Sequence, residues 1–185
     1  LEAIGAEGVE AGGHNGREET TTLCRIPAVR EATTLPLIAA GGIGTGEAIF
    51  ALMALGAEGV QMGTRFALTD ESSASDIFKE YCLRLNEGDT KLLLKKLAPT
   101  RLVTNSFRDR VEAAEGRGAS AEELRELLGR GRAKKGIFEG DLEEGELEIG
   151  QVAALFRRRQ SVDEVMKELL EGYRRASDKI RSAGL

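Results

Sequence analysis

Three short apolar segments in the first 69 residues constrain the fold more than any other feature of the sequence. They span residues 3–8, 35–40 and 59–64, and the second is apolar throughout. Continuous apolar segments are typical of parallel strands that are buried on both faces, because a strand with one wet face alternates polar and apolar residues. We therefore expect three short parallel strands here.

Helical patterns join these expected strands. Residues 47–55 have the apolar spacing of a helix, and Gly56 follows them as a stop signal. Residues 23–32 can form the helix between the first and second strands, with Pro27 in its first turn. Strands that alternate with helices predict a parallel sheet built from β/α units.

Glycine-rich segments follow the second and third strands. Residues 39–46 read Ala-Ala-Gly-Gly-Ile-Gly-Thr-Gly, and residues 61–65 read Gln-Met-Gly-Thr-Arg. Glycine lets the backbone approach an oxyanion closely, and a helix N-terminus offers free N–H groups. A (β/α)₈ barrel binds phosphate after its last two strands. We therefore predict a phosphate site in which Thr64 and Arg65 take part, with a tight corner and a surface salt bridge as the structural alternative.

A histidine follows the first strand. His14 is the single histidine of the chain, and it comes directly after Gly12 and Gly13. A lone histidine is often structural, but catalytic groups of such barrels lie on the loops after the strands. Imidazole also titrates near neutral pH, as a proton-transfer group should. We therefore predict that His14 is catalytic.

From about residue 70 onward the chain is charged and helical, with few strand signals. Ser120 and Ser161 each precede acidic residues, the pattern of a capped helix start. The expected helices span residues 75–86, 105–115, 121–129, 150–156 and 162–182.

Composition excludes several classes of function. The net charge of -5 argues against a nucleic-acid partner, and no apolar segment approaches the length of a membrane span. The two cysteines have neither disulfide nor zinc spacing, so we expect reduced thiols, no metal site and a cytoplasmic protein. Since the chain opens at Leu1 without a signal-peptide pattern, we expect it to be a piece of a longer protein.

Three motifs in this order and spacing resemble the nitronate monooxygenase (2-nitropropane dioxygenase) family, which includes enoyl-ACP reductase II. They are residues 6–14 (AEGVEAGGH), 38–43 (IAAGGI) and 59–66 (GVQMGTRF). The tail, with GDLEEG at 140–145 and Gly150-Gln151, resembles the same family. The resemblance implies an α/β fold, a (β/α)₈ TIM barrel of which only the last three β/α units are present. It assigns residues 1–69 to the FMN-binding barrel and residues 70–185 to a helical substrate domain that packs on it.

The resemblance also implies non-covalently bound FMN. Carried over by position, it makes His14 the catalytic histidine and sets Glu7 and Gly12 beside the flavin. The residues that would cradle the phosphate are Gly41, Gly42, Gln61, Met62, Gly63 and Thr64. Many nitronate-oxidising members carry Gln at the place of Glu7, whereas an acid is common there among reductase-like members, so this position leaves the subtype open. An aliphatic residue is usual at the place of Asn15.

The expected activity is the oxidation of alkyl nitronates with oxygen to a carbonyl compound and nitrite. An enoyl-ACP reductase that uses NAD(P)H as co-substrate is the first alternative. Residues 134–141 resemble the corresponding segment of bacterial NAD(P)H-dependent flavin oxidoreductases. A truncated, inactive fragment is the second alternative, because a full barrel needs about 250 residues. Another phosphate-binding barrel, acting on a phosphorylated sugar or indole, is the third. We expect a small-molecule substrate and a homodimer, with no nucleic acid and no membrane partner.

Overall fold

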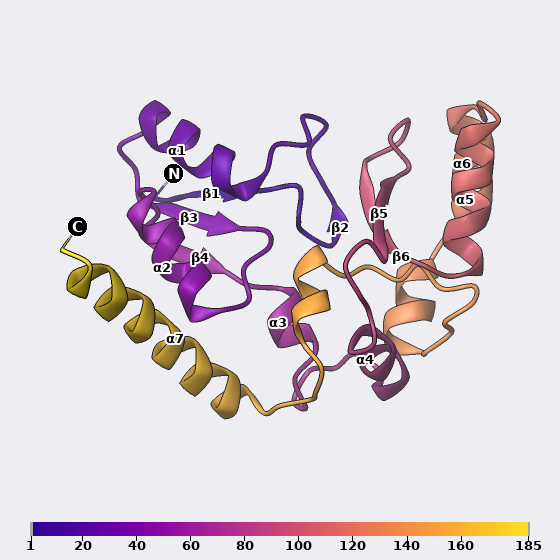
Figure 1. Cartoon of the computed structure of the whole chain (residues 1–185). Coiled ribbons are helices and arrows are strands. Elements are labelled where there is room, and N and C mark those ends of the chain that lie inside the picture. The colour runs from indigo at the N-terminus through magenta and orange to yellow at the C-terminus, as the bar shows by residue number, and fades with distance from the viewer. Residues whose placement is uncertain (1, 185) are drawn as a thin grey trace.

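The computed structural model describes residues 2–184, and its N-terminal part is a three-stranded parallel sheet. The strands are β1 (Ile4–Glu7), β3 (Leu37–Ala40) and β4 (Gly59–Gln61), in the order β1-β3-β4 (Figure 1). Helix α1 (Thr22–Ala32) joins β1 to β3, and α2 (Gly46–Ala54) joins β3 to β4. The predicted parallel β/α units are therefore confirmed, and the sheet is a partial barrel.

One detail of the first helix was predicted wrongly. α1 begins at Thr22, so Pro27 lies inside the helix, in its second turn rather than its first. Proline fixes φ near the helical value, although it cannot donate to the carbonyl oxygen four residues earlier. Ile26, beside it, is fully buried against the sheet.

A second sheet corrects the expectation that few strands occur beyond residue 70. It is antiparallel, in the order β2-β6-β5, with β2 (Gly13–His14), β5 (Thr90–Leu93) and β6 (Thr100–Val103). β5 and β6 are not recognisable from the sequence, because each has only four residues and each contains a cation. Since β2 comes from the N-terminal part, this sheet joins the two parts of the chain.

The remaining elements are mostly helical, as expected. They are α3 (Thr64–Ala67), α4 (Asp76–Cys82), α5 (Ser106–Gly116), α6 (Ala121–Leu128), a π-helical turn η1 (Lys134–Phe138), a 3₁₀ turn η2 (Gln151–Leu155) and α7 (Val162–Ser182). Both predicted starts are confirmed, since Ser120 and Ser161 form capping boxes with Glu123 and Glu164. No helix among residues 2–184 is long and apolar enough to cross a membrane.

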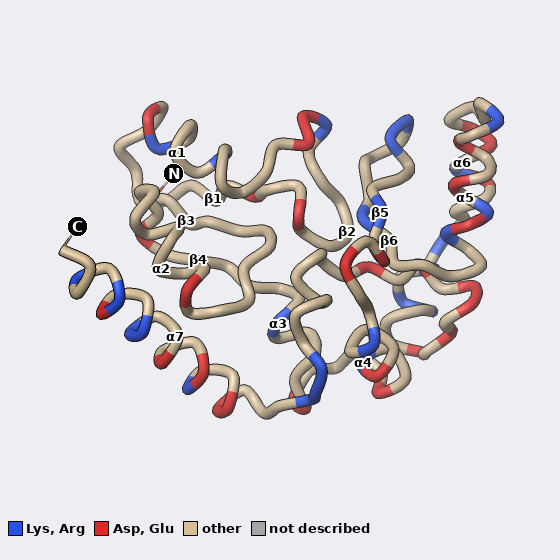
Figure 2. Tube along the Cα trace, viewed as in Figure 1, with Lys and Arg blue, Asp and Glu red and all other residues tan. Residues whose placement is uncertain are grey.

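The long C-terminal helix α7 returns to the N-terminal part and packs against α2 (Figure 1). Gly46 lies against the backbone of Leu169 so closely that no side chain would fit there. Phe50 and Tyr173 pack edge to face with ring centroids 5.6 Å apart. Opposite charges alternate along the outer face of α7, as on a solvated helix (Figure 2).

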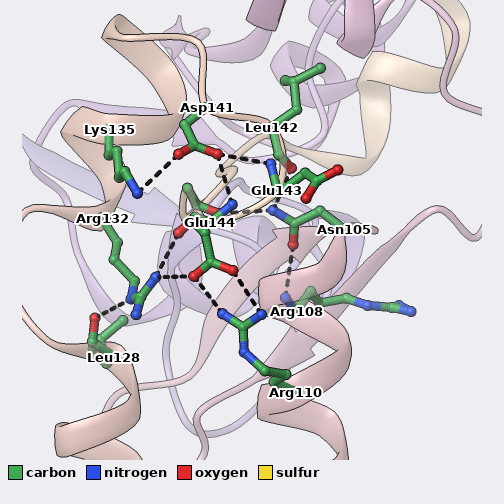
Figure 3. A network of polar contacts seen from close by, with 11 residues as sticks. Asn105, Arg108, Arg110, Leu128, Arg132, Lys135, Asp141, Leu142, Glu143 and Glu144 are labelled. Carbon is green, nitrogen blue, oxygen red and sulfur yellow. Dashed lines mark hydrogen bonds and ion pairs between the residues drawn. The ribbon is translucent and has the colours of Figure 1, made fainter.

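A polar network fastens the loop at residues 141–145 to α5 (Figure 3). Glu144 accepts two hydrogen bonds from Arg110, at 2.9 and 2.6 Å, and one from Arg132 at 3.2 Å. Asn105 donates to the carbonyl oxygens of Leu142 and Gly145 at 2.9 and 2.8 Å. This loop leads directly into residues 146–150, which reach the parallel sheet.

Candidate functional site

A cavity of about 250 Å³ lies at the carboxyl ends of the three parallel strands. It is lined by all eight residues that the sequence predicts to hold a cofactor: Glu7, Gly12, Gly41, Gly42, Gln61, Met62, Gly63 and Thr64. These residues come from three separate strand ends, and the parallel register brings Glu7 beside Ala40 and Ala40 beside Gln61. Ligand sites of open α/β sheets lie at this edge.

Two glycines shape the loop after β3. Gly41 and Gly42 have φ values of +92° and +66°, a conformation that residues with a side chain rarely adopt. A Cβ on Gly41 would lie 2.6 Å from the carbonyl oxygen of Gly8, and one on Gly42 would lie 3.0 Å from Cβ of Glu10. The loop therefore requires glycine at both positions.

Free hydrogen-bond donors line the cavity at both strand ends. Within residues 2–184, the backbone N–H groups of Gly41, Gly42, Gly63 and Thr64 donate to no protein atom. The Thr64 hydroxyl oxygen accepts from the Gly150 N–H at 3.0 Å, which leaves its own proton free to donate. A Cβ on Gly63 would meet no atom within 4 Å, so the space beside this backbone is open. Such donors suit the oxygens of a phosphate group.

The loop after β1 is held in place by three buried or half-buried side chains. The Glu10 carboxylate accepts hydrogen bonds from the backbone N–H of Thr22, at 3.0 and 3.1 Å, and from its hydroxyl at 2.9 Å. The buried Arg101 of β6 donates two hydrogen bonds to the Val9 carbonyl oxygen, at 3.1 and 2.6 Å. These contacts fix Ala11 and Gly12 on the cavity wall.

Carboxylates occupy the end of the cavity near β1. Glu7 lines the cavity and is exposed, and partial burial raises the pKa of its carboxyl. Glu148 is half-buried; burial raises the pKa of its carboxyl as well, while the charge of His14 opposes that rise. Both groups therefore hold a proton more readily than a free carboxylic acid.

His14 does not itself line the cavity. It lies in β2, paired with Thr100 of β6, and its side chain is exposed. Its neighbour Gly13 approaches Glu148 so closely that a Cβ there would be 2.9 Å from the carboxylate. His14 thus lies beside the cavity, with Glu148 reaching into it.

The predicted role of Arg65 at the phosphate site is wrong. Its side chain is 6% exposed and turns toward α7, where it pairs with Glu168 at 2.5 Å and donates to Gln160 at 2.9 Å. The guanidinium also lies over the Phe156 ring, 4.3 Å from its centroid. Arg65 therefore connects the end of β4 to the C-terminal helix and its preceding loop.

Comparison with known proteins identifies the family. The nitronate monooxygenase model matches residues 2–172, nearly the whole chain. The chain belongs to the nitronate monooxygenase family.

Three similar proteins are a probable nitronate monooxygenase, FabK and a nitroalkane oxidase. The chain is 37% identical over 127 residues to a probable nitronate monooxygenase of Staphylococcus aureus, a match that covers 63% of this chain and 35% of the relative. FabK from Thermotoga maritima superposes with a TM-score of 0.92 at 34% identity, covering 99% of this chain and 58% of FabK. Nitroalkane oxidase from Streptomyces ansochromogenes superposes with a TM-score of 0.76 at 30% identity, covering 97% of this chain and 54% of the oxidase. The chain thus spans between about a third and three fifths of these relatives.

Seven cavity-lining residues were not among the predicted ones; Ala11, Ala40 and Ile43 lie within the motifs noted in the sequence, and the other four lie outside them. Glu148, Ile149 and Val152 come from the tail whose family resemblance was noted, and Ala67 comes from α3. The tail motif was visible, but no local pattern indicated that residues 148–152 return to the strand ends of the family's barrel.

Proposed function

We propose that this chain forms the mononucleotide-binding part of an FMN-dependent oxidoreductase of the nitronate monooxygenase type. One observation carries the proposal: the eight predicted residues line a single cavity at adjacent strand ends. The backbone N–H groups of Gly41, Gly42, Gly63 and Thr64 donate to no protein atom among residues 2–184, so they are free to bind the oxygens of a phosphate monoester. The residues present therefore fit FMN.

In this proposal the loops after β3 and β4 hold the phosphate, and the wall at Gly12 faces the flavin ring. The absence of side chains at Gly12, Gly41 and Gly42 lets the backbone approach the cofactor, while Thr64 donates its hydroxyl proton. Bound FMN would supply two-electron transfer and the return of those electrons to oxygen.

The proposed reaction converts an alkyl nitronate and oxygen to a carbonyl compound and nitrite. His14, beside the cavity, would hold the nitro group or move a proton, as imidazole can near neutral pH. The probable nitronate monooxygenase of Staphylococcus aureus and the nitroalkane oxidase of Streptomyces ansochromogenes support this substrate class.

A second candidate is an enoyl-ACP reductase that uses NAD(P)H as co-substrate. The TM-score of 0.92 with FabK favours it. Here His14 would orient the thioester carbonyl or help to deliver a proton.

We also propose the division into a barrel part, residues 1–69, and a substrate domain, residues 70–185. Glu148 and Val152 of the second part line the cavity, which supports a domain that packs on the barrel.

Two assays on the chain supplemented with FMN separate the candidates. Nitrite release from ethylnitronate in air, and its loss when oxygen is removed, is the expected result. NADH consumption that depends on an enoyl thioester, without nitrite release, would support the reductase. FMN binding with neither activity would contradict both substrate assignments for this chain.

A further inference from the structure

Two consecutive glycines make the segment between β1 and β2 intrinsically mobile. Gly12 lines the cavity, and Gly13, which begins β2, has a φ of +74°. Glycine has no Cβ, so the peptide units on either side of it can rotate with little steric cost. The hydrogen bonds of Glu10 and Arg101 hold the part of the loop that precedes these glycines. A further contact is needed to hold the peptide planes at the glycines themselves.

The side chain of Asn15 supplies that contact. Its amide nitrogen donates to the Ala11 carbonyl oxygen at 3.0 Å and to the Gly13 carbonyl oxygen at 2.9 Å, and the residue is half-buried. No other group among residues 2–184 donates to the Ala11 carbonyl oxygen. The two hydrogen bonds therefore bracket Gly12, one on each side.

The geometry of the peptide bond transmits this restraint to Gly12. In a planar trans peptide the C=O and N–H groups point in opposite directions, so a fixed Ala11 carbonyl oxygen also fixes the direction of the Gly12 N–H. This N–H donates to no protein atom in the part of the chain that the structure describes, residues 2–184. Asn15 thus sets the orientation of a free donor in a residue of the cavity wall.

Asn15 is itself anchored outside the loop that it holds. Its backbone N–H donates to the Pro99 carbonyl oxygen at 2.7 Å, where β2 lies beside β6 (Figure 1). Two residues later, Arg17 donates to the carbonyl oxygens of Lys95 and Leu97, at 3.0 and 2.8 Å. The amide of Asn15 therefore projects from a backbone that the antiparallel sheet keeps in place.

We propose that Asn15 is a positioning residue for the flavin ring, because its two hydrogen bonds hold the Ala11–Gly12 peptide in the orientation against which the ring packs. Asn15 does not line the cavity, so its effect passes through the backbone. An aliphatic side chain, which is usual at this place in the family, could form neither hydrogen bond. The inference rests on the proposed function and deepens it, since it assigns a holding side chain to the ring end of the site.

Flavin titration separates this role from that of the phosphate donors. Asn15→Asp keeps the shape of the side chain but cannot donate when ionised, and Asn15→Ala removes the amide. We expect each variant to bind FMN and riboflavin about fivefold or more weakly than the parent, as for a lost hydrogen bond. The ratio of the two affinities should stay unchanged, because the phosphate donors lie on other loops. Asn86→Asp, at an exposed loop asparagine, should bind both flavins as the parent does.

Nitrogen-15 relaxation of the FMN-free chain tests the restraint itself. In the parent the amide order parameters of Gly12 and Gly13 should lie near about 0.85, the value of a rigid backbone, and in both Asn15 variants they should fall below about 0.6. The amide of Gly63, on the loop after β4, is the internal control and should not change.

Four results would overturn the inference. They are unchanged mobility of Gly12 and Gly13 in both folded variants, unchanged affinity for both flavins, a loss of affinity confined to FMN, and loss of the folded circular dichroism signal in both variants, which would make Asn15 a residue needed for folding. Failure of the parent to bind FMN would refute the proposed function. Equal FMN binding by the parent and both variants would refute only the role of Asn15.

Discussion

Glu146 makes the stability of the protein depend on pH. Burial, reinforced by the charge of Glu148 and opposed by that of Arg132, raises the pKa of the Glu146 carboxyl from 4.5 to about 7. Its side chain is 8% exposed. The folded state therefore favours the protonated form, and the unfolded chain releases the proton at lower pH.

The sign of the effect follows from proton linkage. Between pH 4.5 and about 7 the folded state binds more protons at Glu146 than the unfolded state, so stability is highest below this range and falls as pH rises through it. A pKa difference of one unit corresponds to about 1.4 kcal/mol, so the loss in the free energy of unfolding has an upper limit of about 3 kcal/mol. The side chain keeps some access to solvent, so we expect a loss of about 1–2 kcal/mol.

Glu146→Gln removes this titration with little change in shape. Urea unfolding, followed by circular dichroism at about pH 5 and about pH 8, should show the variant gaining about 1–2 kcal/mol relative to the parent at the higher pH. The matched control is Glu143→Gln, at an exposed glutamate of the same loop. If the difference between Glu146→Gln and the parent is the same at both pH values, the account of Glu146 is wrong.

Three further predictions concern named side chains. Gly41→Ala should destabilise the fold by about 2 kcal/mol or more in urea unfolding, because the position needs a φ of +92° and a Cβ would meet Gly8. Gly63→Ala, whose Cβ would meet nothing within 4 Å, should keep its stability but bind FMN at least tenfold more weakly. Equal stability and equal FMN affinity of the two variants would refute this prediction. Arg65→Ala should cost about 2 kcal/mol of unfolding free energy, against less than about 0.5 kcal/mol for the exposed Arg158→Ala, and a similar cost for both would contradict the structural role of Arg65. With Ellman's reagent at about pH 8, exposed Cys24 should react in the folded protein and Cys82 should not, because burial raises the pKa of the Cys82 thiol to about 12; rapid reaction of both would show that the core around Cys82 opens.

The parallel sheet was predictable because its signals are local. β3 is a continuous apolar segment, glycines follow all three strands, and the turn after β3 requires the positive φ of Gly41 and Gly42. The helix starts at Ser120 and Ser161 were predictable for the same reason, since a cap depends on residues three positions apart.

The missed features depend on partners distant in sequence. Arg101 reads as a surface cation, yet it is buried because it donates to Val9, 92 residues earlier. Arg65 reads as a phosphate ligand, but its partner Glu168 lies 103 residues later. Glu148 stands in an acidic stretch whose composition suggests a solvated surface, but it pairs with Leu102 of β6 and lines the cavity.

The central claim is that the amides after β3 and β4 together bind the phosphate of a mononucleotide. Titration of the chain with FMN and with riboflavin, which lacks the phosphate, tests it directly through quenching of flavin fluorescence. We predict that FMN binds at least tenfold more tightly than riboflavin, and that Gly63→Ala removes most of this difference. Equal affinities for the two flavins, or no binding of FMN, would contradict the claim.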